Sequence, residues 1–112
     1  MIKVTPATIR ASYELLVKLP PFTRWKLPPT KDIEFVATRA TDCYGEYEPE
    51  HIIRVSSAKN GHLDTLLRTV AHEIIHMVRA CRRDPNWDKH DDKFAAMAAE
   101  VAVNMGFDPK EL

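Results

Sequence analysis

Cysteine, glycine and long apolar runs are scarce in this sequence. Its 112 residues include two cysteines, Cys43 and Cys81, and three glycines. Two cysteines are too few for a disulfide framework, so we expect two free thiols in a reducing compartment. The N-terminal residues lack the apolar core and cleavage site of a signal peptide, and no apolar run is long enough to span a bilayer. We therefore expect a cytoplasmic protein that has no membrane partner.

An excess of either charge is also absent. Sixteen basic residues balance 16 acidic ones, which argues against a dedicated nucleic-acid-binding domain. The composition that remains, 45% hydrophobic and 29% charged residues, is that of an ordinary globular protein. The length fits one domain over residues 1–112, and we expect it to be a monomer.

Apolar periodicity predicts three helices and three short strands. Thr5-Pro6 is typical of a helix start, and Gly106 of a helix end. The predicted helices cover residues 6–19, 63–83 and 89–105, and the predicted strands cover residues 33–38, 43–47 and 52–56. Short turns between the strands suit antiparallel hairpins. The sequence thus predicts an α+β domain, in which a small antiparallel three-stranded sheet packs with three helices.

The central long helix contains the motif His72-Glu-Ile-Ile-His76, an HExxH pattern. Residues four apart lie almost one above the other on a helix, so both imidazoles can reach one metal ion. Glu73 then stands beside the ion as a general base for a metal-activated water. The two histidines also fall opposite the apolar face of this helix, which consists of Leu63, Leu66, Val70, Ile74, Met77 and Cys81.

A third ligand completes a site of this kind while leaving one position open. His62 lies roughly 15 Å from His72 along the helix and is too far away. His90 is placed at the start of the last helix, on its inward face, and is the favoured ligand. His51 is not excluded by geometry, and Glu100 is a competing candidate from the last helix.

These residues give the sequence its resemblance to a known family. The HExxH motif, the connection after it, and His90-Asp-Asp-Lys-Phe94 resemble the SprT-like metalloproteases, which include the Spartan proteases. In that family, a histidine in a His-Gly-x-x-Phe element is the third zinc ligand. The resemblance covers about residues 33 to 105 and implies a minimal protease domain that holds one Zn²⁺ through His72, His76 and His90.

The chain departs from the family pattern in three respects. Lys89 and Asp91 occupy the places where the family has a glycine beside the third histidine. No cysteine-pair zinc ribbon follows the last helix, and the DNA-binding and recruitment tails of the Spartan proteins are not present. Cleavage of DNA-crosslinked proteins is therefore the part of the resemblance that transfers least.

The expected function is that of a zinc metalloendopeptidase acting on a protein or peptide substrate. The alternative is a catalytically silent, zinc-stabilised binding or regulatory module associated with nucleic-acid-bound partners; a base at position 73 favours catalysis. A small three-histidine endoribonuclease would need a more compact spacing than the step from His76 to His90. Candidates for stabilising an oxyanion are Tyr44, Tyr47 and Arg82.

Two weaker signals concern the substrate and nucleic acid. A peptide could add as a strand to a free sheet edge near residues 42–47 or 52–55, unless the acidic side chains there only protect that edge. Basic residues gather around the connection between the last two helices: Arg79, Arg82, Arg83, Lys89 and Lys93. Such a run either attracts phosphates or forms a solvated face.

Overall fold

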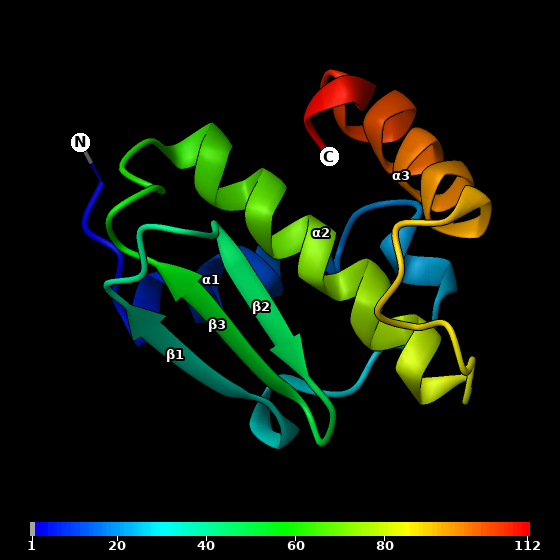
Figure 1. The fold of residues 1–112 in the computed structure, drawn as a ribbon, viewed down its shortest axis with the longest axis horizontal. Coiled ribbons are helices and arrows are strands. Elements are labelled where there is room, and N and C mark those ends of the chain that lie inside the picture. The colour runs from blue at the N-terminus through cyan, green and yellow to red at the C-terminus, as the bar shows by residue number, and fades with distance from the viewer. Residues whose placement is uncertain (1) are drawn as a thin grey trace.

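The computed structural model describes residues 2–112 and shows an α+β fold, as predicted. The helices are α1 (Pro6–Leu16), α2 (Leu63–Cys81) and α3 (Asp92–Met105), and the strands are β1 (Glu34–Thr38), β2 (Gly45–Glu48) and β3 (Ile52–Ser56). Helices α1 and α2 pack against a three-stranded sheet, and α3 packs against α2 (Figure 1). Short 3₁₀ turns lie at Phe22–Arg24, Thr30–Asp32 and Pro109–Glu111.

Helix α2 is the central element of the molecule. It contacts α1, strands β2 and β3, and α3, so that the sheet lies on one side of it and α3 on the other (Figure 1). Every residue from Thr69 to Arg79 is buried except His72. The prediction of one apolar face and one polar face was wrong for this part of α2. Leu63 and Cys81, assigned to the apolar face, are exposed, whereas His76 is buried.

The sheet is mixed, and this corrects the predicted all-antiparallel arrangement. The strand order is β1-β3-β2: β3 pairs antiparallel with β2 and parallel with β1. Strand β3 carries the fully buried Ile53 and Val55 and takes the centre, while the strands with exposed glutamates form the edges. The connection from β1 to β2 therefore passes over the end of β3 instead of forming a hairpin. Ser56 anchors it, donating to the Ala40 carbonyl through its hydroxyl and to the Tyr44 carbonyl through its amide.

Helix ends follow local capping. Thr5 and Thr8 hydrogen bond reciprocally at the start of α1. Asp91 caps α3 by accepting from the Phe94 amide at 3.0 Å, so α3 begins at Asp92 and not at residue 89. Gly106, in the left-handed conformation with φ 79°, ends it. His90 consequently lies in the loop before α3, not on the helix as predicted.

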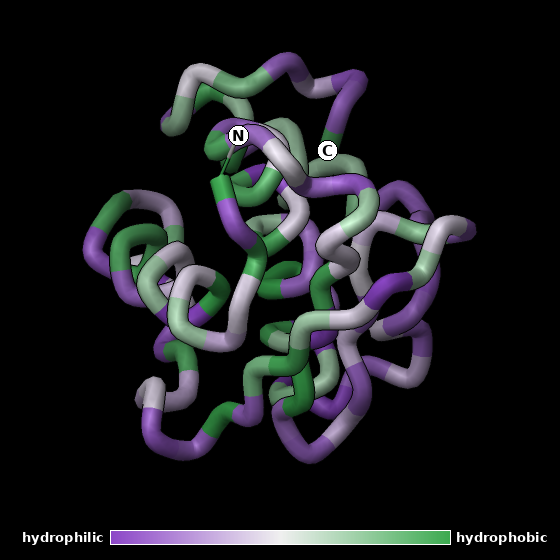
Figure 2. The backbone as a smooth tube through the Cα atoms, turned by 90° about the vertical axis from the view of Figure 1, so that its left-hand side faces the viewer, coloured by the Kyte–Doolittle hydropathy of each residue, from purple (hydrophilic) through white to green (hydrophobic). Residues whose placement is uncertain are grey.

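Hydrophilic and hydrophobic positions are interspersed along the described backbone (Figure 2). Among the described residues, no helix combines the length and apolarity needed to cross a bilayer. The core instead collects side chains from all elements, including Ile9, Tyr13, Ile53, Val70 and Val101.

Candidate metal centre

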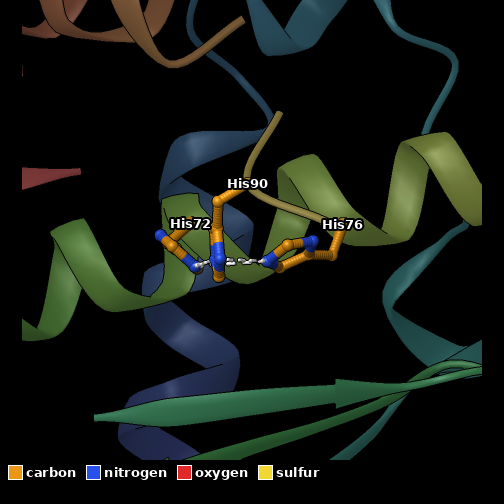
Figure 3. A group of neighbouring side chains, drawn as sticks. All are labelled: His72, His76 and His90. Atoms are coloured by element: carbon orange, nitrogen blue, oxygen red, sulfur yellow. Dashed lines mark hydrogen bonds between the residues drawn. The ribbon is translucent and has the colours of Figure 1, made fainter. Parts of the chain in front are cut away.

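Three imidazoles meet at one point between α2 and the loop before α3. His72 and His76 come from successive turns of α2, and His90 reaches them from the loop (Figure 3). The three Nε2 atoms lie 3.0 Å (72–90), 3.2 Å (72–76) and 3.3 Å (76–90) apart. Within residues 2–112 this is the one group of histidine, cysteine or carboxylate side chains whose spacing could hold a metal ion.

The spacing of these nitrogens fits a small divalent cation. Ligand nitrogens about 2.0–2.1 Å from zinc at tetrahedral angles stand about 3.3 Å apart, close to the three distances found here. Three neutral lone pairs directed at one point repel one another, and a cation is the partner that all three can share. The residues present therefore fit one metal ion with an open fourth position.

Hydrogen bonding fixes the tautomer of His76. Its Nδ1 lies 2.7 Å from the backbone carbonyl of Trp87. A carbonyl can only accept, so Nδ1 carries the proton and Nε2 presents its lone pair to the centre. Burial, with the neighbouring imidazoles, lowers the pKa of His72 to about 3, and burial lowers the pKa of His76. Both rings are thus neutral at neutral pH and ready to bind a metal.

Phe94 supports all three imidazoles. Its ring centroid lies 4.8 Å from that of His72 and 4.9 Å from those of His76 and His90, stacked on His76 at 30°. Phe94 is buried. This aromatic residue, part of the motif that carries the family resemblance, therefore packs against the ligand rings and restricts their orientation.

A buried arginine holds the loop that presents His90. Arg79 is 1% exposed and donates from Nη1 and Nη2 to the two oxygens of Asp91, at 2.8 and 2.9 Å. Its Nε donates to Asp84 at 2.9 Å, and Nη1 also donates to the Lys89 carbonyl at 3.1 Å. One guanidinium thus joins both ends of the loop, on either side of His90.

This network changes the interpretation of the basic cluster. Arg79 is inside the protein and ion-paired, so it is not available to a phosphate. Lys93 lies 3.4 Å from Asp84 and shares that carboxylate. Arg82, Arg83 and Lys89 are exposed.

Glu73 lies beside His72 on α2, and its side chain is almost entirely buried. It is 4% exposed. Burial, together with the charge of Glu46, raises its pKa to about 8, and a hydrogen bond from the Tyr47 backbone amide opposes the rise. In the metal-free protein Glu73 therefore holds its proton at neutral pH, and a cation at the neighbouring histidines would favour the ionised carboxylate that a general base needs.

Strand β2 approaches Glu73 so closely that only glycine fits at position 45. A Cβ added to Gly45 would lie 2.8 Å from Thr69 Cγ2, 2.9 Å from the Arg54 carbonyl oxygen and 3.2 Å from Glu73 Oε2. Asn60 fixes this part of the strand: its Nδ2 donates to the Tyr44 and Ser56 carbonyls, and its Oδ1 accepts from Thr69. The start of β2 is thereby held against the face of α2 that carries Thr69 and Glu73.

An open cleft of about 650 Å³ runs along this face. His72, Glu73 and His90 line it, together with Gly45 and Tyr44 of the segment that begins β2. The C-terminal turn, through Glu111 and Leu112, forms part of its wall. The open side of the three-histidine group therefore faces a space that can hold a ligand next to a buried carboxylate.

The alternative ligands lie elsewhere. His51 is in the β2–β3 turn, with Nδ1 3.4 Å from the Tyr47 hydroxyl. His62 precedes α2, and Glu100 pairs with Arg24 at 3.1 Å on the surface. Of the oxyanion candidates, Tyr44 lines the cleft, Tyr47 is buried, and Arg82 is exposed.

Sequence reasoning missed Arg79, Asn60 and Gly45 as residues that shape the site. The N-cap role of Asp91 could have been predicted, because an aspartate directly before an apolar helical run is typical of a helix start. No comparable local pattern marks Arg79 or Asn60, because their partners are distant in sequence.

No protein-family model matches the chain, and comparisons with curated proteins and with solved structures likewise find no match. The HExxH motif and the geometry of its side chains are therefore the guide to function.

Proposed function

We propose that this protein is a zinc metallopeptidase of the SprT-like kind, with His72, His76 and His90 as zinc ligands and Glu73 as general base. The observation that carries the proposal is the convergence of three Nε2 atoms within 3.0–3.3 Å of one another, beside a buried carboxylate and an open cleft. A purely structural zinc site is closed and has no use for such a carboxylate.

Bound zinc would supply Lewis acidity, polarising a substrate carbonyl and making a water more acidic. Glu73 then accepts a proton from that water through its carboxylate and passes it to the leaving amine. The side chain of Glu73 is 4% exposed, so little of its carboxylate faces bulk water. Phe94 and Arg79 act through the ligands, by keeping the imidazole rings and the His90 loop in place.

The free edge of β2 supports a peptide as substrate. Ser56 donates its amide to the Tyr44 carbonyl, which makes residues 44 and 56 a hydrogen-bonded pair. In an antiparallel ladder such pairs alternate, so the amide and carbonyl of Gly45 point away from β3. Gly45 also lines the cleft. An extended peptide that paired there would lie beside Glu73 and the histidines.

Metal analysis and a protease assay test the proposal together. We expect purified protein to bind one equivalent of zinc and to cleave an unfolded protein or a peptide library, with loss of activity on chelation and recovery with added zinc. Running the assay with and without DNA determines whether the exposed basic residues near His90 contribute an activating contact.

The decisive variant is Glu73→Gln. It should retain zinc, because Glu73 is not a ligand, and lose activity by roughly 100- to 10,000-fold, as expected when a general base is removed. His90→Ala should lose zinc, whereas His62→Ala, a histidine outside the cluster, should keep both metal and activity. Full activity of Glu73→Gln would remove that residue from the mechanism. Stoichiometric zinc without any turnover would instead favour the binding-module alternative.

A further inference from the structure

Arg68 lies in the cleft one helical turn before His72. It is on α2, and its side chain is 19% exposed. Four residues along a helix correspond to about 6 Å, on the same face. Arg68 and two of the three histidines, His72 and His90, therefore line the same cleft.

A carboxylate already occupies the Arg68 site. Glu111 Oε2 lies 2.6 Å from Arg68 Nη1, at the wall of the cleft. The contact uses only one oxygen of Glu111. The other polar contacts of Arg68 are a hydrogen bond from Nη2 to Thr65 Oγ1 at 3.2 Å and a distant pairing with Asp64 at 3.8 Å.

Arg68 makes fewer short ionic contacts than Arg79 does. Arg79 binds both oxygens of Asp91, and its Nε binds Asp84, so its donors are engaged by two carboxylates that are 35% and 11% exposed. Arg68 has a single short ionic contact, to a side chain whose own exposure is 55%. A guanidinium can hold a carboxylate through two parallel hydrogen bonds. A ligand that bound both Nη atoms of Arg68 could thus replace Glu111.

We propose that Arg68 determines the specificity of the cleft by binding a carboxylate of the peptide substrate in the place that Glu111 occupies here. The inference rests on the proposed function and names its substrate class: peptides that carry an acidic group close to the scissile bond. The carboxylate can be an Asp or Glu side chain, or the α-carboxylate at a peptide's C-terminus. Glu111 acts as an internal competitor for the same site.

The test compares matched peptides. Each pair differs only by Glu or Gln at one position near the cleaved bond, and each peptide is made with a free and with an amidated C-terminus. We expect the zinc-loaded protein to show a 10- to 100-fold higher kcat/KM for the acidic member, the range expected of hydrogen bonds to charged groups. The difference should appear mainly in KM. If the side chain is the bound group, this Glu/Gln difference persists in the amidated pair. If the α-carboxylate is the bound group, the Glu and Gln peptides are cleaved alike and amidation lowers kcat/KM of both by 10- to 100-fold.

Two variants and one control assign the preference to Arg68. Arg68→Gln should bring the Glu/Gln ratio close to one. Glu111→Gln should lower KM for the acidic peptide several-fold, because the competitor is gone. Arg24→Gln removes a similar ion pair, with Glu100, on the surface outside the cleft, and should leave the ratio unchanged. Circular dichroism checks that each variant is folded; if Arg68→Gln is not, Arg68→Lys and Glu111→Gln carry the test.

Failure of this inference is distinguishable from failure of the proposed function. Hydrolysis of all four peptides (Glu or Gln, free or amidated C-terminus) at equal rates by wild-type protein overturns the role of Arg68 and leaves the peptidase intact. If no peptide is cleaved, affinities of the same pairs for the zinc-loaded Glu73→Gln variant, measured by fluorescence anisotropy, still decide the point. Equal affinities overturn the inference, and a preference for the acidic peptide that Arg68→Gln abolishes supports it.

Discussion

At Glu73 a carboxyl group is buried against a glycine of the neighbouring strand, and this placement has a stability cost that depends on pH. The pKa of Glu73 is raised to about 8 in the folded protein, from 4.5 for an unperturbed glutamate. Below pH 4.5 the group is neutral in both folded and unfolded states. As pH rises towards 8, the unfolded chain is ionised while the folded one holds its proton, so the free energy of unfolding decreases.

Glu73→Gln should therefore stabilise the metal-free protein at alkaline pH. The amide carries no charge to desolvate, so we expect a gain of roughly 1–3 kcal/mol over wild type at pH 8, shrinking to near zero at pH 4.5. Urea denaturation of both proteins in the presence of a chelator, at several pH values, measures this. The histidines contribute equally to the pH dependence of wild type and of the variant. The difference between the two curves of unfolding free energy against pH therefore reports on Glu73 alone. A difference that does not vary with pH would contradict the explanation.

Individual residues of the centre were predictable where the chemistry follows helical spacing. His72 and His76 needed only an i, i+4 relation to be brought together, and Glu73 follows from its place beside the first histidine. His90 was identified correctly as the third member of the group, although its predicted position on a helix was wrong. The burial of Arg79 could not be predicted, because it depends on a loop that folds back over the end of α2.

At the scale of elements, the loop between α2 and α3 is the part that completes the metal centre. Its start is tied through Asp84, and its end through Asp91, to the same arginine. Trp87 lies between them, and its backbone carbonyl accepts a hydrogen bond from Nδ1 of His76. The loop has no regular secondary structure, so its ion pairs and hydrogen bonds take the role of a scaffold for His90.

Replacing Arg79 should weaken metal binding without touching a ligand. Removing a residue that orients a metal ligand through hydrogen bonds typically lowers metal affinity 10- to 100-fold, and we expect a loss in that range for Arg79→Met. The measurement is zinc competition against a chromophoric chelator, on protein shown to be folded. Arg82→Met, at an exposed arginine close by on the chain, is the matched control and should bind zinc like wild type. Wild-type affinity in a folded Arg79→Met protein would refute the positioning role.

The pairing of the strands illustrates a limit of local patterns. Residue composition indicated three strands at nearly their observed positions, and the β2–β3 hairpin was correct. Short connections favoured a second hairpin between β1 and β2. Burial decided otherwise, since Ile53 and Val55 place β3 in the centre and leave β1 to pair with it in parallel. Which strand takes the middle of the sheet depends on the relative burial of all three strands, and the pattern of one strand alone does not show it.

At the scale of the molecule, the metal centre joins parts of the chain that have few other contacts. The protein has a radius of gyration of 12.8 Å, and α3 packs against one side of α2 (Figure 1). A cation held by α2 and by the loop before α3 would link these elements as a crosslink does. Metal binding and folding stability should accordingly be coupled.

Zinc should raise the thermal stability of the protein. At a free zinc concentration 100 times the dissociation constant, a ligand that binds only the folded state adds about 2.7 kcal/mol, which corresponds to an increase of roughly 10 °C in Tm for a domain of this size. Differential scanning fluorimetry with zinc, and then with excess chelator, measures the shift and its reversal. His90→Ala should lose most of the shift and His62→Ala should retain it. A zinc-independent Tm would contradict the coupling.

Trp87 gives this centre a built-in optical reporter. Its backbone carbonyl accepts a hydrogen bond from Nδ1 of His76, and its ring centroid lies 6.5 Å from that of the same imidazole. The indole also packs edge-on against Tyr47, with ring centroids 5.7 Å apart. A quenching ion such as Co²⁺ or Cu²⁺ at the three histidines should therefore dim the indole emission, while Zn²⁺, which has no unpaired electrons, should not. Titration of wild-type and Trp87→Phe proteins would read occupancy directly from fluorescence, without any substrate.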